Sequence, residues 1–517
     1  MGMGRAGGRE AEETMSGNRY WLQTLGCPKN QVDSDKLAGQ LEDDGYLPAE
    51  TAERADLVVV NTCAFIEAAR EESIAAVLEV AGSRKPGSRL VVTGCLAERY
   101  GSELEEALPE VDMVAGFGVP LAPPAPQNDT VPRAPVRISA RLRPRSPTDG
   151  FDLLELPRPR SGAPWAYVKV AEGCDRICGF CAIPSFRGRQ RSRRPEDILA
   201  EVEQLARPSA AGRTGGTGAG EAGDATGEAH GVREIVLVAQ DLASYGRDRS
   251  TRRAHDRRPS LGADGSASSQ PIVALTEAVA SVVSRTRLLY LYPSGLTDEL
   301  VEAILGTGVP YFDLSLQHAS RPLLAAMRRW GDGERFLRRI EEIRRAAPDA
   351  TFRSSFILGY PGETEEDHDV LLSFLTQAEL DWAGFFLFSP EDGTHAAGMD
   401  DQVPPELALE RMRECTELQD RITARRRDAM VGTLCEVLVD EAGIGRTVHE
   451  APEIDGVVHV PAHLEAGTMA QMVITASLGT DLVAEPVTGA ESVAGAEPAA
   501  SGSFAASGQP TFSGRGR

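Results

Sequence analysis

Three short apolar runs near the start of the chain predict parallel strands. The runs cover residues 21–25, 57–60 and 90–93, each is bounded by turn residues, and helical patterns follow at 31–44 and 66–81. Short apolar runs that alternate with amphipathic helical stretches are typical of a parallel sheet covered by helices. The pattern therefore predicts a small parallel α/β domain over residues 19–120.

The same alternation continues over residues 161–402. Six units are too few to close an eight-stranded barrel, so the pattern predicts a partial, open (β/α)6 barrel with its chemistry at the carboxyl ends of the strands. Strands are expected to begin near residues 166, 234, 287, 311, 352 and 384, with helical patterns at 195–206, 272–284, 298–305, 333–347 and 365–378.

Two further elements are expected after the barrel. Residues 403–430 form an amphipathic pattern rich in Arg and Glu, which predicts a connecting helix. Residues 431–488 alternate short apolar strands with Gly and Pro turns, as a small β-barrel does. The fold class is therefore α/β, with a flavodoxin-like N-terminal domain, a partial barrel and a C-terminal β-barrel.

Other segments lack apolar periodicity. Residues 121–160 are rich in Pro and Arg and predict an extended, solvated linker, with a basic arm that touches RNA as the alternative. Disorder is expected for the N-terminus, the C-terminal tail and two surface insertions, because their composition cannot bury enough apolar surface. These segments are 1–18, 489–517, and the insertions near 208–232 and 247–270.

The composition of the 517-residue chain excludes several classes of protein. Hydrophobic residues make up 41%, and no apolar run approaches the roughly 20 residues that a membrane-spanning helix needs. The N-terminus is rich in Gly and charge and lacks the apolar centre of a signal peptide, which predicts a cytoplasmic protein. Eight cysteines in a reducing compartment are better explained as ligands or buried thiols than as disulfides. The formal net charge of −23 argues against a molecule that binds nucleic acid over its whole surface.

Cys174, Cys178 and Cys181 lie in a short loop after the first predicted barrel strand. Three closely spaced thiolates suit soft iron and leave one iron of a cubane cluster without a protein ligand. A structural zinc site is the alternative, but it needs a fourth Cys or His, and none lies within ten residues on either side. The spacing resembles the signature of radical S-adenosylmethionine (SAM) enzymes, in which SAM binds the open iron.

Three other cysteines, Cys27, Cys63 and Cys95, each follow a predicted strand of the N-terminal domain. Ligands gather at the carboxyl edge of doubly wound sheets, so these thiols are expected to converge. A buried structural thiol is the usual role for any one of them. Three thiols in the same structural position favour a second, auxiliary cluster, again with one open iron.

Polar and aromatic groups near the strand ends are candidates for binding SAM or substrate. Gln240 is a candidate for either ligand, and Phe180 is placed to pack against the adenine of SAM, with an apolar anchor for the loop as the equal alternative. His318 has no second ligand nearby, so we expect a hydrogen-bonded structural histidine. The turn at 359–363 either contributes to the site or only precedes a helix capped by Thr364.

The remaining candidates are expected to have simpler roles. One role for the arginines after the cluster loop is to bind a carboxylate of the substrate or of SAM. We expect instead that they lie in solvent at the start of a helix. Cys415 and Cys435 are expected to be packed thiols. The arginines are Arg187, Arg189, Arg191, Arg193 and Arg194.

Taken together, the motifs resemble the radical SAM methylthiotransferase family. They are LGCPKNQVDS at 25–34, VNTC at 60–63, TGC at 93–95 and the 174–181 loop, with family-like stretches also at 355–364 and 388–394. The resemblance runs from about residue 20 to a C-terminal barrel similar to the TRAM module. Within the family, residues 28–34 resemble the RimO type, which modifies an aspartate of small-subunit ribosomal protein S-twelve.

The resemblance implies SAM and two 4Fe-4S clusters as cofactors. The cluster on Cys174, Cys178 and Cys181 would cleave SAM to a radical, and the cluster on Cys27, Cys63 and Cys95 would deliver a methylated sulfur. The implied reaction is methylthiolation of the β-carbon of an aspartate in ribosomal protein S-twelve, free or within the small subunit. A one-electron donor such as flavodoxin or ferredoxin is implied, and a membrane is not.

Two other functions stay open at this point. The first is the same chemistry on an adenosine of transfer RNA, and the second is a non-enzymatic iron–sulfur scaffold, which would need no SAM pocket or barrel. Charge favours a protein substrate over transfer RNA. Residues 431–488 contain nine acidic residues and one basic residue, Arg446, and such a surface would repel phosphates. The alternative is an acidic face that only keeps the protein solvated. The nine are Glu436, Asp440, Glu441, Glu450, Glu453, Asp455, Glu465, Asp481 and Glu485.

Overall fold

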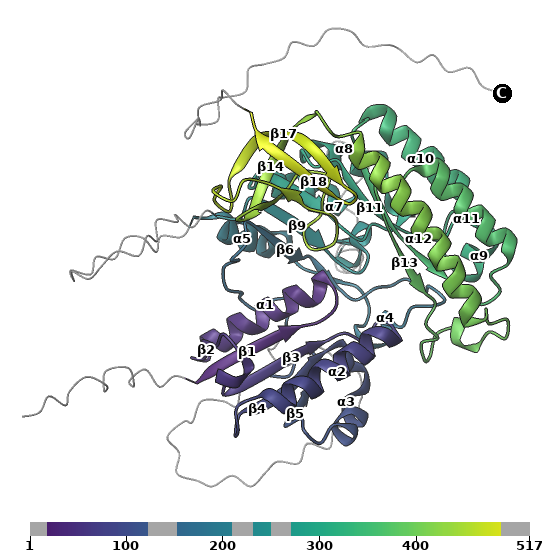
Figure 1. The fold of residues 1–517 in the computed structure, drawn as a ribbon. Helices are drawn as coiled ribbons and strands as arrows, with labels where there is room; N and C mark the ends of the chain where they lie inside the picture. Colours follow the sequence, from purple (N-terminus) through teal and green to yellow (C-terminus); the bar gives the residue numbers. More distant parts are fainter. Residues whose placement is uncertain (1–17, 122–151, 209–230, 250–269, 488–517) are drawn as a thin grey trace, which may run out of the picture.

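The computed structural model describes residues 18–121, 152–208, 231–249 and 270–487. Figure 1 shows the N-terminal sheet at one end, a curved set of strands backed by helices in the middle and the C-terminal barrel beside it. The predictions of disorder for both termini and for the two insertions fall wholly or largely outside the described residues.

The N-terminal domain is a five-stranded parallel sheet in the order β2-β1-β3-β4-β5. This is the strand order of flavodoxin-like folds, as expected. β3 is buried along its whole length, and apolar residues on both faces of the sheet form two cores. The elements are β1 (Arg19–Thr24), α1 (Pro28–Asp43), β2 (Leu47–Pro48), η1 (Ala52–Arg54), β3 (Leu57–Thr62), α2 (Glu67–Ser83), β4 (Arg89–Gly94), α3 (Cys95–Ala107) and β5 (Met113–Ala115).

Six parallel strands form the middle of the molecule, which we call the half-barrel. β6 (Trp165–Lys169), β9 (Glu234–Val238) and β10 (Arg285–Leu288) make one sheet, and β11 (Tyr311–Gln317), β12 (Thr351–Leu358) and β13 (Trp382–Leu387) make the other. A parallel bridge between Leu291 and Leu314 joins the two sheets. Each strand begins within two residues of its predicted start, so the prediction of a partial barrel is confirmed.

Helices cover the convex face of the half-barrel and enclose its main core. They are α5 (Pro195–Ala206), α7 (Pro271–Ala280), α8 (Asp298–Gly306), α10 (Gly333–Ala346) and α11 (Glu365–Ala378). α11 begins with a capping box, in which Thr364 and Asp367 bond each other's backbone N–H, as predicted. The shorter elements are β7 (Ala171–Glu172), α4 (Ile183–Phe186), β8 (Arg191–Ser192), η2 (Leu242–Ser244), η3 (Pro293–Gly295), α9 (Arg321–Ala326) and η4 (Ala396–Gly398).

The C-terminal part consists of one long helix and a closed barrel. α12 (Pro405–Asp428) packs against β13 and leads into β14 (Leu434–Glu441), β15 (Ile444–Arg446), β16 (Val458–His459), β17 (Met469–Leu478) and β18 (Asp481–Pro486). The strands close in the order β14-β15-β16-β18-β17 around their own apolar core. Cys415 is fully buried and Cys435 packs against that core, so both are packed thiols as expected.

The prediction of a solvated linker is wrong at its C-terminal end. Leu154 is buried, and the Arg158 guanidinium donates to the Tyr167 carbonyl at 2.6 Å and pairs with Asp35 of α1. This segment packs because its apolar and basic side chains find partners on two domains at once. The arginines between residues 133 and 145 lie outside the described residues.

The loop between β15 and β16 inserts into the concave face of the half-barrel. Ala451 packs there with Tyr167 and Tyr311, and the Tyr167 hydroxyl donates to the Pro452 carbonyl at 2.8 Å. Among the helices of the described ranges, none is both long and apolar enough to span a membrane.

A buried cluster of charged side chains joins the half-barrel to the C-terminal barrel beneath this loop. The carboxylate of Glu234 accepts from Arg287 at 2.7 Å and from Arg446 of β15 at 2.9 Å. Burial opposes ionisation of Glu234, but the guanidinium groups outweigh it and lower its pKa from 4.5 to about 2. Asp440 provides a second carboxylate for Arg446.

Replacing Glu234 by Gln should lower the free energy of unfolding at pH 7 by about 3 to 5 kcal/mol, because two buried guanidinium groups lose their shared anion. The folded-state pKa lies below the ordinary value, so the contribution is complete above pH 4.5 and is lost as the pH falls towards 2. Urea unfolding followed by circular dichroism over this pH range measures it. Glu334→Gln, which breaks only the exposed pair with Arg338, is the control and should change little. A deficit that is the same at pH 7 and at pH 2 would contradict the assignment.

Candidate functional site

Cys27, Cys63 and Cys95, the N-terminal cysteine set, meet at the carboxyl edge of the first sheet. Cys27 caps α1, Cys63 directly follows β3, and Cys95 begins α3. Gly26, at φ +97°, must be glycine, because a Cβ there would lie 2.8 Å from the Cβ of Cys63. Burial and the two neighbouring thiols raise the pKa of Cys63 to about 12, as expected where three sulfur atoms converge.

Two asparagines hold this edge together. Asn30 donates to the carbonyls of Leu25 and Thr62, at 2.9 and 3.1 Å. Asn61 donates to the Asn30 carbonyl and to the Ser34 hydroxyl, each at 2.9 Å. The start of α1 is thereby tied to the ends of β1 and β3, which fixes Cys27 relative to the other two thiols.

Cys174, Cys178 and Cys181, the loop cysteine set, lie above the end of β6. Gly179 fixes the loop at both backbone groups, because its N–H donates to the Met327 carbonyl and its carbonyl accepts from Ala396, both at 2.8 Å. A side chain at Gly179 would collide with the Tyr360 hydroxyl. Burial and the other two thiols raise the pKa of Cys181 to about 12.

Polar side chains beside the loop set fit the polar groups of SAM. Arg176 pairs with Asp241 at 2.7 Å and lies over the Tyr292 ring, and Arg329 covers the same ring and reaches the Cys178 sulfur at 3.4 Å. Three buried atoms here lack a partner among the described residues, namely Gln240 Oε1, Asp241 Oδ1 and Arg329 Nε. Acceptors suit an amino group or ribose hydroxyls, and a guanidinium suits a carboxylate, so these residues fit SAM.

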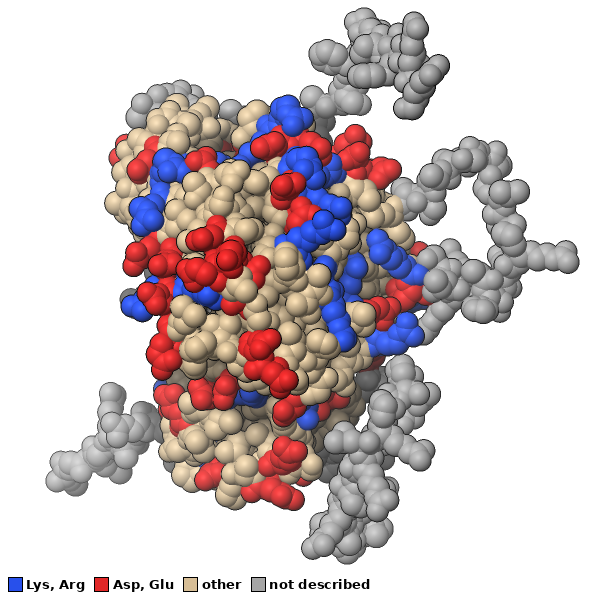
Figure 2. All heavy atoms as spheres, turned by 90° about the vertical axis from the view of Figure 1, so that its right-hand side faces the viewer, with Lys and Arg blue, Asp and Glu red and all other residues tan. Residues whose placement is uncertain are grey.

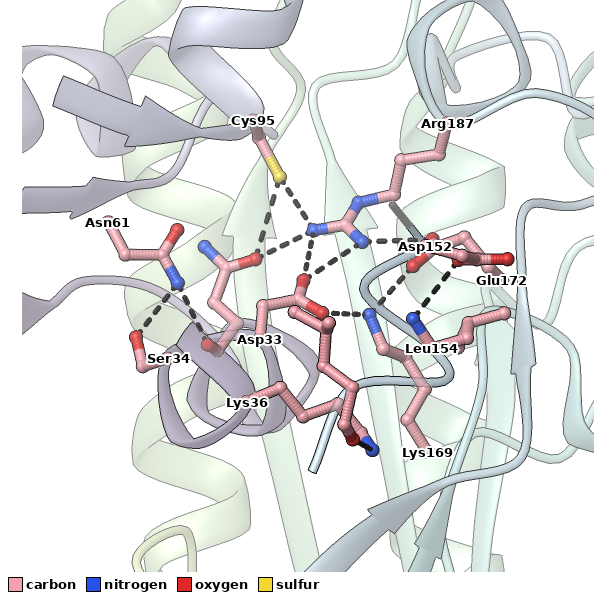
Figure 3. A network of polar contacts seen from close by, with 12 residues as sticks. Asp33, Ser34, Lys36, Asn61, Cys95, Asp152, Leu154, Lys169, Glu172 and Arg187 are labelled. Atoms are coloured by element: carbon pink, nitrogen blue, oxygen red, sulfur yellow. Dashed lines mark hydrogen bonds and ion pairs between the residues drawn. The ribbon is translucent and has the colours of Figure 1, made fainter. Parts of the chain in front are cut away.

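A buried ionic network runs from Cys95 of the N-terminal set to Glu172, which lies two positions before Cys174 in the sequence (Figure 3). Lys169 of β6 pairs with Asp33 of α1 and with Glu172, the latter at 2.7 Å. Arg187 donates to Glu172 at 2.9 Å, to Asn30 at 2.8 Å and to the Cys95 sulfur at 3.0 Å. Burial opposes the charge on Glu172, but Arg187 and Lys169 hold its pKa far below its usual range.

The structure also places the other predicted residues. Gln240 donates to Glu172 at 2.8 Å and lies next to the network, whereas Phe180 packs against the main core beside the loop set. His318 is fully buried and its Nδ1 accepts from the Ser320 N–H at 3.0 Å, as expected of a hydrogen-bonded histidine, while its Nε2 has no partner among the described residues. The turn at 359–363 is held by Glu363, whose carboxylate accepts from two backbone N–H groups of that turn.

The expectation that the arginine run enters a helix in solvent is wrong for two of its members. Arg187 and Arg193 are buried, and Arg193 pairs with Glu201 at 2.7 Å. Their carboxylate partners lie on other elements, which a local charge count does not reveal. Sequence reasoning also missed Arg329, because nothing near it in the sequence distinguishes it from the exposed Arg328.

Among the described residues, no group of three His, Cys, Asp or Glu side chains is arranged to hold a single metal ion. All six cysteines of the two sets are free thiols. Burial raises the pKa of Cys27, but Lys29, Arg187 and backbone N–H groups outweigh it and favour the thiolate, the form that binds iron. The two sets therefore have the donor chemistry that iron–sulfur clusters require.

Three known families match the chain in succession. They are "Uncharacterized protein family UPF0004" over residues 19–116, the radical SAM superfamily over 168–375 and the TRAM domain over 431–487. The ribosomal protein uS12 methylthiotransferase RimO of Frankia casuarinae is 38% identical, covering 90% of this chain and 92% of the relative. The chain belongs to the RimO family. The RimO protein of Moorella thermoacetica is 40% identical, over 88% of this chain and 96% of the relative.

Membership of the RimO family makes the chain a radical SAM methylthiotransferase that uses SAM and 4Fe-4S clusters. This confirms the expected class of enzyme, its cofactors and the three-part fold. Among solved structures, the radical SAM methyltransferase TsrM from Kitasatospora setae, with tryptophan and a SAM analogue bound, has a TM-score of 0.41 and 15% identity. That similarity covers 78% of this chain and 89% of TsrM.

If each cysteine set holds one cubane cluster, anaerobically reconstituted protein should contain about eight irons per chain. Replacing Cys174, Cys178 and Cys181 by Ala should leave about four irons and abolish SAM cleavage. Replacing Cys27, Cys63 and Cys95 should also leave about four irons, with SAM cleavage retained and methylthio transfer lost. Iron analysis and electron paramagnetic resonance measure these outcomes. Cys415→Ala is the control and should keep the full iron content. Methylthio transfer by the second triple variant would refute the auxiliary assignment.

Proposed function

We propose that this enzyme methylthiolates the β-carbon of an aspartate in ribosomal protein S-twelve. The observation that carries the proposal is identity of 38 to 40% to RimO proteins over about nine-tenths of the chain. The site supports it, because Arg187 links Cys95 of the N-terminal set to Glu172, which lies two positions before Cys174 of the loop set. One set is suited to making a radical and the other to holding the sulfur.

Each part of the site has a task in this reaction. When bound, the clusters and SAM supply the radical chemistry and the sulfur. Cys174, Cys178 and Cys181 hold one cluster, and Cys27, Cys63 and Cys95 hold the other. Gln240, Asp241 and Arg329 offer SAM polar atoms that have no partner within the described part of the chain, and Phe180 borders the same loop. The buried ion pairs of Lys169 and Arg187 keep the two sets in a fixed relation, so that radical and sulfur meet at one carbon.

The proposed partners follow from this reaction. The substrate is a basic ribosomal protein, free or in the small subunit, which sets the reaction in the cytoplasm. A one-electron donor such as flavodoxin or ferredoxin must reach the loop cysteine set, whose Ile177 is 73% exposed and offers an apolar contact beside the cluster. No membrane is needed for any step.

Charge on the C-terminal barrel supports a protein substrate less strongly than the count of residues predicts. Asp440, Glu450 and Asp455 pair with Arg446, Arg427 and Arg353 inside the molecule. Glu441, Glu465 and Glu485 are exposed, and none of the described residues forms a salt bridge with them. Elsewhere, on the side of the molecule that carries α10, α11 and α12, acidic and basic side chains are mixed (Figure 2), so the negative charge of the molecule is not spread evenly. Exposed acidic groups still disfavour phosphate and favour a basic protein.

Cells that lack this protein should contain ribosomal protein S-twelve without its methylthio group. Mass spectrometry of the ribosomal protein and of transfer RNA from the same cells measures both possible products. Complementation with the wild-type chain should restore the modification, whereas the Cys174→Ala variant should not. Loss of methylthiolated adenosine from transfer RNA, with the ribosomal protein unchanged, would overturn the proposal and favour the alternative substrate.

Replacing Glu441, Glu465 and Glu485 together by Lys should raise the KM for the ribosomal protein severalfold at low salt, because the basic substrate loses its electrostatic attraction. At 1 M salt, where the screening length is about 3 Å, the difference should vanish. The same change at Glu103, Glu105 and Glu106, which are exposed on the N-terminal domain, alters net charge equally and serves as the control. An equal effect of both triple variants would show that the barrel has no special part in binding.

A further inference from the structure

Lys29 lies beside Cys27 of the N-terminal set, and its ammonium has no hydrogen-bond or salt-bridge partner among the described residues. It is the second residue of α1, two positions after Cys27, and its side chain is only partly accessible. Its Nζ lies 3.1 Å from the centre of the Tyr290 ring, at the end of β10. Within the described ranges, no hydrogen bond or salt bridge involves this ammonium, although it carries three N–H donors.

Three other cations near Lys29 have carboxylate partners within the described ranges. Lys169 pairs with Asp33 and Glu172, and Arg187 pairs with the same two carboxylates. Arg353 pairs with Asp313 at 3.1 Å and with Asp455. None of these four carboxylates forms a salt bridge with Lys29 in the parts of the chain that the structure describes.

Asp313 faces Lys29 but is already engaged. Its Oδ1 accepts from Arg353 at 3.1 Å, and its Oδ2 accepts from the Tyr290 N–H at 2.9 Å. Both oxygens of Asp313 therefore already accept a hydrogen bond. The Lys29 ammonium is left available to an anion that enters the site from outside the protein.

Tyr290 is held in an uncommon backbone conformation directly below this ammonium. Its φ is +66°, which is rare for a residue other than glycine, and its carbonyl accepts from the Leu242 N–H at 3.3 Å. Strained backbone of this kind concentrates at functional sites. The ring attracts the ammonium through its face without using any N–H donor, so the donors stay available to a ligand.

We propose that the Lys29 ammonium binds the side-chain carboxylate of the target aspartate. This inference rests on the proposed function, in which an anionic side chain must enter between the clusters. A donor on the carboxylate fixes the adjacent β-carbon and leaves its C–H bonds free. Arg329, beside Cys178 and also without a carboxylate partner among the described residues, is the matching cation for the carboxylate of SAM.

The test compares two peptides that carry the target loop of ribosomal protein S-twelve, one with the native Asp and one with Asn at the target position. Their binding to the reconstituted full-length protein is measured by fluorescence anisotropy. Asn keeps the shape of Asp and removes the charge. The protein variants are Lys29→Met, which keeps the length of the side chain without its charge, and Lys29→Arg, which keeps the charge.

Wild-type protein should bind the Asp peptide roughly tenfold or more tightly than the Asn peptide, as a charge-assisted hydrogen bond provides. The ratio should fall close to one in Lys29→Met and stay mostly intact in Lys29→Arg. Because each ratio is internal to one variant, a general loss of packing weakens both peptides and leaves the ratio unchanged. A wild-type ratio in Lys29→Met would overturn the assignment.

Two further readouts distinguish binding of the aspartate from binding of SAM and from failure of the proposed function. Weaker SAM binding by Lys29→Met, with the peptide ratio intact, would assign the ammonium to SAM and overturn the inference. If wild-type protein methylthiolates neither the Asp peptide nor the intact ribosomal protein, the proposed function itself fails. If it modifies the Asp peptide while Lys29→Met keeps the wild-type ratio, only the role of Lys29 fails.

Discussion

Arg187 touches Cys95 on one side and Glu172 on the other, and this contact fixes how the N-terminal domain sits on the half-barrel. Domains within a chain usually meet through modest polar interfaces and move against each other. Here the charges are buried, so removing one partner leaves an uncompensated ion, and rotation of the domains is costly. Glu391 adds a second attachment, because it pairs with Arg70 and Arg99 of the N-terminal domain. Two separate ionic attachments therefore hold the N-terminal domain, with its cysteine set, against the half-barrel.

Local pattern was enough to predict the strands of the half-barrel and the convergence of Cys27, Cys63 and Cys95. Apolar periodicity marks a buried strand directly, and parallel strands end at a common edge. The edge strands β2 and β5 were not predicted, because a strand of two or three residues is too short to show a pattern of apolar positions. The burial of Arg187 could not be predicted either, since Asp33 and Glu172 become its partners only when two domains meet.

The count of charged residues in the C-terminal barrel correctly predicted a net negative charge, but it did not predict which of the acidic side chains are buried. Glu450 is completely buried against Arg427, and Asp455 lies beneath Tyr311 and Arg353. Glu450 ties the barrel to α12 and Asp455 ties it to the half-barrel, so neither is available to a substrate. The sequence contains no signal that separates such residues from Glu441 or Glu485, because burial here is decided by a loop that enters another domain.

That loop has a consequence for exchanging parts between relatives. Ala451 and Pro452 fill the concave face of the half-barrel, and Arg446 supplies half of the charge pair around Glu234. A C-terminal barrel taken from another protein would bring its own loop and its own charges into this space. Such a chimaera also needs Glu234, Arg285 and Arg287 of the half-barrel to come from the same protein as the C-terminal barrel. The unit that can be exchanged is therefore the C-terminal barrel together with the half-barrel residues that it contacts.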